Sequence, residues 1–140
     1  GIFNTNADNE VVRLHRSGNR VGNITVSTSA TAYNTSSDYR LKENVVTDWD
    51  ATTRLKQLKP SRFNFKTDKD TTVDGFLAHE VSSIVPEAVS GEKDAVDKDG
   101  NIEAQGIDQS KLVPLLTKAL QEAMERIETL EAKVTALEGK

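Results

Sequence analysis

The C-terminal segment repeats apolar residues at alternating spacings of three and four, a pattern typical of coiled-coil helices. One position of the repeat holds Val113, Leu120, Ile127 and Val134, and the other holds Leu116, Ala123, Leu130 and Leu137. These eight residues, called the seam below, span four consecutive heptads. Asp108 or Ser110 is suited to cap the start of the helix, and Pro114 falls in its first turns. The pattern predicts a helix over about residues 110–138 that associates with copies of itself.

Charged residues beside the seam favour parallel helices. Arg126 with Glu131, and Lys133 with Glu138, occupy positions where opposite charges on neighbouring helices pair. Two alternatives stay open at this level. A single amphipathic helix also packs on its own domain. β-Branched residues at one seam position with leucine at the other favour a dimer, so the heptads alone do not establish a trimer.

The composition excludes several classes of partner and site. A net charge of -4 argues against a nucleic-acid or anionic-membrane surface, because both require a basic face. The chain has no cysteine, so neither disulfides nor thiolate metal sites are available. No apolar run approaches the roughly 20 residues of a membrane helix, and residues 1–20 lack the apolar core of a signal peptide. We therefore expect a soluble protein without nucleic-acid or membrane partners.

Residues 1–36 are rich in polar β-formers and poor in large apolar side chains. The segment EVVRLHR alternates loosely, SGN predicts a turn, and NITVSTSATAYNTSS is rich in Thr, Ser and Val. Such a segment buries too little surface to offset its conformational entropy alone. It is therefore either part of a β-structure assembled from several chains or a disordered linker, and composition does not separate the two.

A small α+β body is predicted between this segment and the C-terminal helix. Asp50 is suited to cap a short helix that carries Leu55 and Leu58 and ends at Pro60. The strand pattern SRFNFK and the apolar run in VDGFLAHEV supply a modest core, and DKDGN predicts a turn between two edge strands. The predicted fold class is α+β, with an N-terminal fibre-like β segment, a small mixed body and a long C-terminal helix in a parallel trimeric coiled coil.

Several motifs of cofactor and metal chemistry are incomplete. His79 and Glu80 begin like a zinc-protease helix, but the second histidine is missing, so His79 is better explained as a packed or surface residue. AVDKDG resembles a calcium loop, yet Ala95 and Gly106 occupy the positions of essential ligands. The chain has no Walker-type loop and no GxSxG elbow. We expect no metal and no cofactor.

The stretch TSSDYRLKENV places a serine and a lysine five residues apart, at the end of a run without charge from Val21 to Ser37. Serine is a poor nucleophile until a base takes its proton, and a lysine serves as base only where burial or a nearby positive charge favours its neutral form. Arg40 is a candidate source of such a charge. Taken alone, the pair Ser37 and Lys42 is also explained by an N-cap serine and a solvated lysine.

A set of motifs in fixed order favours the catalytic interpretation of Ser37 and Lys42. SDYRLKENV, LKPSRFNF, GFLAHEV and IDQSKLVPLLTKALQEAMERIETLEAKV resemble the C-terminal intramolecular chaperone, autoprocessing domain of bacteriophage tail spikes, tail fibres and endosialidases. The resemblance implies cleavage between Ser36 and Ser37, with Ser37 as nucleophile and Lys42 as general base. Asp38, Arg40 and Glu43 are candidates for supporting this dyad. His79 stands where the family more often has glutamine.

The resemblance also implies the domain organisation and the biological role. Residues 1–36 would be the end of an upstream β-fibre, the client, and residues 37–140 the chaperone and autoprotease. The chaperone would trimerise, register the client and release itself. This would occur in the host cytoplasm during virion assembly, with the client in the virion tail and the chaperone part set free. Two alternatives are a non-catalytic trimeric or receptor-binding fibre tip and a plain coiled-coil module.

Overall fold

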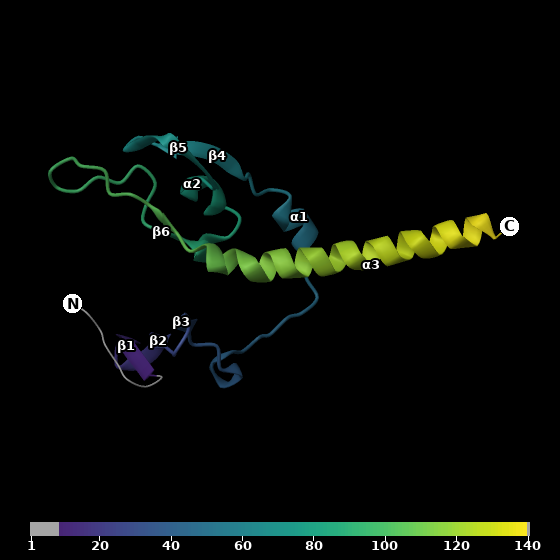
Figure 1. Cartoon of the computed structure of the whole chain (residues 1–140), viewed down its shortest axis with the longest axis horizontal. Coiled ribbons are helices and arrows are strands. Elements are labelled where there is room, and N and C mark those ends of the chain that lie inside the picture. Colours follow the sequence, from purple (N-terminus) through teal and green to yellow (C-terminus); the bar gives the residue numbers. More distant parts are fainter. Residues whose placement is uncertain (1–8, 140) are drawn as a thin grey trace. The chain divides into compact units, whose positions relative to one another are not determined.

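The chain forms two compact units, which divide between Thr47 and Asp48 (Figure 1). The computed structural model describes residues 9–139. Small sheets and one long C-terminal helix confirm the α+β class predicted from the sequence. The sequence predicts a different kind of boundary, between residues 36 and 37, where a client would end and a chaperone begin. The division into compact units does not test it, so it stays a prediction. No helix within residues 9–139 combines the length and the apolar character needed to cross a membrane.

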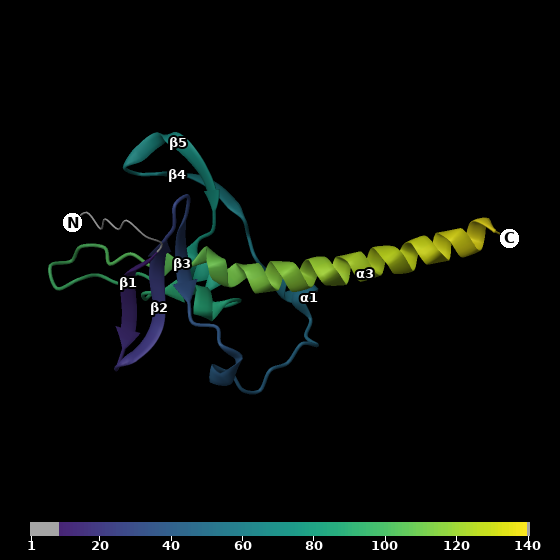
Figure 2. The ribbon, with the colours of Figure 1, turned by 60° about the horizontal axis from the view of Figure 1, so that its bottom comes forward.

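The first unit is built on a three-stranded antiparallel sheet. Its strands β1 (Asn9–Arg16), β2 (Asn19–Val26) and β3 (Thr31–Thr35) lie in the order β1-β2-β3 (Figure 2). Ser17 and Gly18, with φ of 49° and 82°, form the tight turn between β1 and β2 that the SGN motif predicts. The described part of the polar N-terminal segment is therefore a sheet, which favours the β alternative over a disordered linker.

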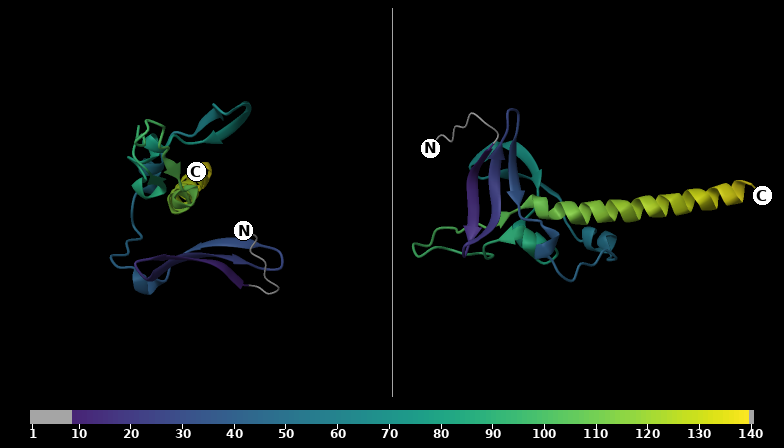
Figure 3. Two further views of the ribbon diagram at one scale, coloured as in Figure 1. Left: turned by 90° about the vertical axis from the view of Figure 1, so that its left-hand side faces the viewer. Right: turned by 90° about the horizontal axis from the view of Figure 1, so that it is seen from below.

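The two faces of this sheet differ in character. Val12 lies opposite Ile24, and Ile24 lies opposite Tyr33, so these apolar residues form one row across three strands. Figure 3 shows the strands as a single layer. Tyr33 is 80% exposed, and within this layer only Gly22 and Asn23 are buried. The described part of this unit, residues 9–47, thus has almost no core of its own, as the composition predicts.

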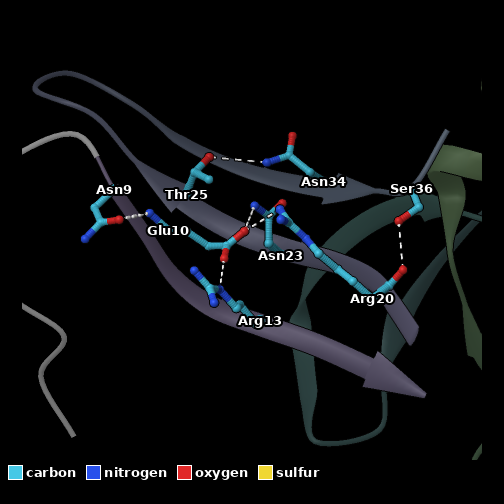
Figure 4. Close-up of polar contacts among 8 residues, drawn as sticks. All are labelled: Asn9, Glu10, Arg13, Arg20, Asn23, Thr25, Asn34 and Ser36. Atoms are coloured by element: carbon cyan, nitrogen blue, oxygen red, sulfur yellow. Dashed lines mark hydrogen bonds and ion pairs between the residues drawn. The ribbon is translucent and has the colours of Figure 1, made fainter. Parts of the chain in front are cut away.

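The opposite face carries a cluster of polar contacts around Glu10. The Glu10 carboxylate accepts hydrogen bonds from Arg13 and Asn23 and pairs with Arg20 (Figure 4). The Arg13 hydrogen bond is the largest of the influences that hold the pKa of Glu10 below its usual value. β1 and β2 are therefore tied by side chains as well as by the strand ladder.

The second unit contains short elements and one long helix. These are α1 (Ala51–Leu55), the hairpin of β4 (Ser61–Phe65) and β5 (Asp68–Gly75), α2 (Ala78–Val81), β6 (Val89–Ser90), β7 (Gly106–Ile107) and α3 (Val113–Glu138). Short 3-10 turns lie at η2 (Pro86–Ala88) and η3 (Gln109–Leu112). Within this unit, α3 continues well beyond the short elements packed on its first turns (Figure 1).

Local sequence signals predict several of these elements correctly. The Asp50 side chain accepts a hydrogen bond from the Thr53 N–H at 2.9 Å and caps α1 as expected. The helix is shorter than predicted, because it ends at Leu55 and leaves Leu58 and Pro60 beyond it. The SRFNF strand is β4, and the DKDGN turn closes on Asp97, which accepts bonds from the backbone of Asp99 and Asn101. Asp108 caps η3, so the predicted helix start is a 3-10 turn followed by α3.

The first turns of α3 pack on their own unit. Leu112, Leu115 and Ala119 are buried with residues of α1, α2 and η2, and the whole core comprises Ala51, Leu58, Val81, Val85, Ala88, Leu112, Leu115 and Ala119. The single tryptophan, Trp49, packs against this core. The amphipathic-helix alternative is therefore correct for one face of the N-terminal half of α3.

The seam occupies a different face of α3. Leu115 is 2% exposed, whereas the adjacent seam residue Leu116 is 49% exposed. All eight seam residues are exposed in the single chain: Val113, Leu116, Leu120, Ala123, Ile127, Leu130, Val134 and Leu137. Folding of the chain on itself uses one apolar face and leaves the seam for association.

Glu122 links α3 to the start of α1. Its carboxylate accepts hydrogen bonds from the Ala51 N–H at 3.0 Å, the Thr52 N–H at 2.8 Å and the Thr52 hydroxyl at 2.5 Å. The backbone N–H groups at a helix start lack partners inside the helix, and a carboxylate there also interacts favourably with the helix dipole. The hydrogen bond from the Thr52 side chain is the largest of the effects that lower the pKa of Glu122 below its usual value.

The substitution Glu122→Gln should make the stability of the chain less dependent on pH. A carboxyl whose pKa is lowered by folding stabilises the fold above its unfolded value, here near 4.5, and this stabilisation is lost as the pH falls through the folded value. We expect the thermal midpoint of the variant to lie below that of wild type at neutral pH, with the difference vanishing on acidification. Glu128→Gln, on an exposed part of α3, is the control. Equal midpoints for Glu122→Gln and wild type at every pH would contradict this assignment.

Candidate active site

The candidate site begins where the sheet of the first unit ends. Ser36 directly follows β3, yet its N–H still donates to the Val21 carbonyl at 3.0 Å. Its hydroxyl donates to the Arg20 carbonyl at 3.2 Å (Figure 4). Two hydrogen bonds thus hold Ser36 on β2, and the Ser36–Ser37 peptide bond is the first to leave the ladder.

A 3-10 turn, η1 (Tyr39–Leu41), follows at once. Asp38 is its N-cap: its side chain accepts from the Arg40 N–H at 2.9 Å, and its carbonyl accepts from the Leu41 N–H at 3.1 Å. The Lys42 N–H donates to the Tyr39 carbonyl at 3.1 Å. Aspartate is among the residues preferred at this position because its short side chain reaches the free N–H groups of the turn.

The turn brings the two predicted catalytic residues together. Lys42 Nζ donates a hydrogen bond to Ser37 Oγ at 2.8 Å. This distance is within the range required between a nucleophile and its general base. Both residues are exposed in the single chain. The assignment of Ser37 and Lys42 as a catalytic dyad stays a prediction, and the geometry is what that chemistry requires.

The guanidinium of Arg40 forms a bidentate contact with the carboxylate of Asp38. Arg40 Nε donates to Asp38 Oδ1 at 2.9 Å, and Nη2 donates to Oδ2 at 2.6 Å. The hydrogen bonds from the Arg40 side chain are the largest cause of the lowered pKa of Asp38. The Asp38 carboxylate in turn raises the pKa of Arg40. The sequence suggested Arg40 as a positive charge acting on Lys42. In the structure its charge is compensated by Asp38 instead.

Sequence reasoning named the members of this site but missed two of its contacts. Glu43, the third candidate for support, directly follows Lys42 and is exposed. The hydroxyl anchor of Ser36 and the double contact between Asp38 and Arg40 were not anticipated. An aspartate before a short turn is a readable N-cap signal, whereas the partner of a serine hydroxyl depends on strand register.

The other candidates lie in the second unit. His79 is an exposed residue of α2, and the seam residues line the exposed face of α3. Among residues 9–139, no three His, Asp or Glu side chains are grouped so that they could hold a metal ion. The chemistry that the described site can support is acyl transfer between a hydroxyl and an adjacent carbonyl, assisted by an amine.

Comparison with known families identifies the segment that contains this site. Residues 37–90 match a peptidase family model that is described as the chaperone of endosialidase. The match begins at Ser37 and ends before α3, so it covers the candidate dyad but not the seam. A comparison with curated proteins gives no significant match.

Proposed function

We propose that this chain, which carries a chaperone of endosialidase domain over residues 37–90, is the C-terminal intramolecular chaperone of a phage tail fibre or tail spike. Its client is the upstream β-structure that ends at Ser36. Three copies associate through the seam, register their clients, and then release them by cutting the Ser36–Ser37 bond. The contact between Ser37 Oγ and Lys42 Nζ at 2.8 Å, directly beyond the last ladder bond of the client, is the observation that carries this proposal.

The client explains why a chaperone is needed. A sheet with one partly exposed apolar row and almost no core gains its stability only when further layers cover it. Fibres assembled from several chains have many long-range contacts and must start in register, so their unassisted folding is slow and prone to misassembly. Association of three C-terminal helices raises the effective concentration of the attached clients to roughly millimolar.

The reaction is an acyl shift followed by hydrolysis. The neutral Lys42 amine accepts the Ser37 hydroxyl proton while Oγ attacks the Ser36 carbonyl carbon. The C–N bond then breaks, the Ser37 nitrogen takes the proton back from Lys42, and an ester joins Ser36 to Ser37 Oγ. Water hydrolyses this ester, which leaves a Ser36 carboxylate and a free Ser37 amine. Each chain reacts once and uses no cofactor.

In this proposal, association of three chains provides the desolvated environment that a lysine base requires. An exposed lysine is fully hydrated, and only desolvation or a nearby positive charge favours the neutral amine that a base requires. Covering the turn in the trimer provides that desolvation. Cleavage then makes assembly kinetically irreversible, because the folding device is no longer attached. We place these steps in the host cytoplasm, with the client retained in the virion tail and the chaperone part released.

Variants of the dyad test the proposed chemistry. Ser37→Ala and Lys42→Ala should leave the chain whole on a denaturing gel while the trimer persists. Lys42→Arg should also be inactive, since a guanidinium does not release its proton near neutral pH. Ser37→Cys and Ser37→Thr keep a nucleophilic atom and should retain slow cleavage.

Two exposed residues outside the turn serve as matched controls for this test. Ser29→Ala and Lys66→Ala remove the same side chains elsewhere and should cleave as wild type does. Rapid cleavage by Lys42→Arg, or a whole wild-type chain in a stable trimer, would contradict the dyad. The second result would favour the non-catalytic fibre tip.

A seam variant tests whether assembly precedes cleavage. Ile127→Asp would bring three carboxylates together at the helix axis, each costing several kcal/mol unless protonated. We expect loss of both the trimer, measured by native mass spectrometry, and cleavage. Ala132→Asp introduces the same charge on another exposed face of α3 and should affect neither. Cleavage by a monomeric Ile127→Asp chain would show that one chain forms a complete active site.

A further inference from the structure

Asp38 accepts three hydrogen bonds from a single residue. The backbone N–H, Nε and Nη2 of Arg40 all donate to its carboxylate, at 2.9, 2.9 and 2.6 Å. We propose that Asp38 is a positioning residue of the dyad. Arg40 is its clamp, meaning that its hydrogen bonds hold the Asp38 carboxylate in place while its charge balances that carboxylate. Together they fix the turn that carries Lys42 to Ser37. This inference rests on the proposed function of Ser37 and Lys42.

Polar contacts are what shape this turn. None of the residues of η1 is buried in the single chain, so no apolar packing within the chain fixes it. Tyr39 and Leu41 are exposed, at 81% and 73%. A lysine side chain has four rotatable bonds, and holding its amine against one hydroxyl costs rotamer entropy. Fixing the backbone of residues 38–42 removes part of that cost before the dyad forms, which is how positioning raises a reaction rate.

The charge of Asp38 explains why Arg40 is needed beside it. An unpaired carboxylate near Lys42 would stabilise its ammonium form and oppose its role as base. The Arg40 guanidinium compensates this charge while it holds the carboxylate in place. Glu43 directly follows Lys42 in the chain, and the Arg20 side chain on β2 pairs with Glu10.

Two single variants and their combination separate positioning from charge. Asp38→Asn keeps an acceptor for the Arg40 N–H but removes the negative charge, and Arg40→Gln removes the positive charge. The full chain is synthesised in a cell-free system and exchanged into buffers of different pH. The first-order rate constant of cleavage is then followed on denaturing gels. Asp48→Asn, an exposed charge change outside the turn, is the control.

The inference predicts shifts of opposite sign. In Asp38→Asn the uncompensated arginine should lower the pH midpoint of cleavage, and in Arg40→Gln the uncompensated carboxylate should raise it. Each shift should be at least a few tenths of a pH unit, the size expected for one exposed charge in salt, and larger to the extent that the trimer covers the turn. The double variant should restore the midpoint of wild type. Its rate constant at high pH should nevertheless stay about 10- to 100-fold lower, because the two side-chain hydrogen bonds that fix the turn are lost.

Other outcomes overturn one proposal or the other. Wild-type rates and midpoints in both single variants would overturn the positioning role of Asp38, even where Ser37→Ala and Lys42→Ala abolish cleavage. Slower cleavage without any shift in midpoint would reduce the pair to a purely structural contact and overturn the counter-charge role. Cleavage that persists in Ser37→Ala and Lys42→Ala would instead overturn the proposed function itself.

Discussion

The division of α3 into two apolar faces is the constraint on which the rest of this chain depends. One face buries Leu115 and Ala119, together with Leu112 at the end of η3, in the core of the second unit. The other presents the seam to solvent. Because the two faces share one rigid helix, folding of the unit sets the direction in which the seam points from it. Glu122 adds a polar link from this helix to the start of α1.

The sheet of the first unit has almost no core of its own, so its stability depends on packing against further layers. The sheet is a single layer with a partly exposed apolar row, and its last ladder bonds hold Ser36. The candidate dyad starts at the next residue. A sheet that is incomplete alone, followed directly by the turn that holds Ser37 and Lys42, is consistent with the proposed order in which assembly precedes cleavage. The exposure of Lys42 in the single chain is consistent with the same order, in which association covers the turn before cleavage.

Periodic and local features were predictable from the sequence, and long-range contacts were not. The seam repeats over four heptads, so the long helix and its exposed face were predicted from spacing alone. The N-cap at Asp50 was predicted because capping depends on neighbouring residues. The hydrogen bonds of Glu122 join residues about seventy positions apart, and no spacing rule finds such a pair. Ser37 and Lys42 were named through resemblance, whereas the clamp of Asp38 by Arg40 depends on side-chain rotamers.

The most direct measurement is the intact mass of the wild-type protein under denaturing conditions, paired with its native mass. The account predicts two denatured masses, for residues 1–36 and 37–140, whose sum exceeds the whole chain by one water molecule. It also predicts serine as the new N-terminus and a native assembly with three copies of the C-terminal fragment. A single denatured mass for the whole chain within a native trimer, or a new N-terminus other than Ser37, would contradict it.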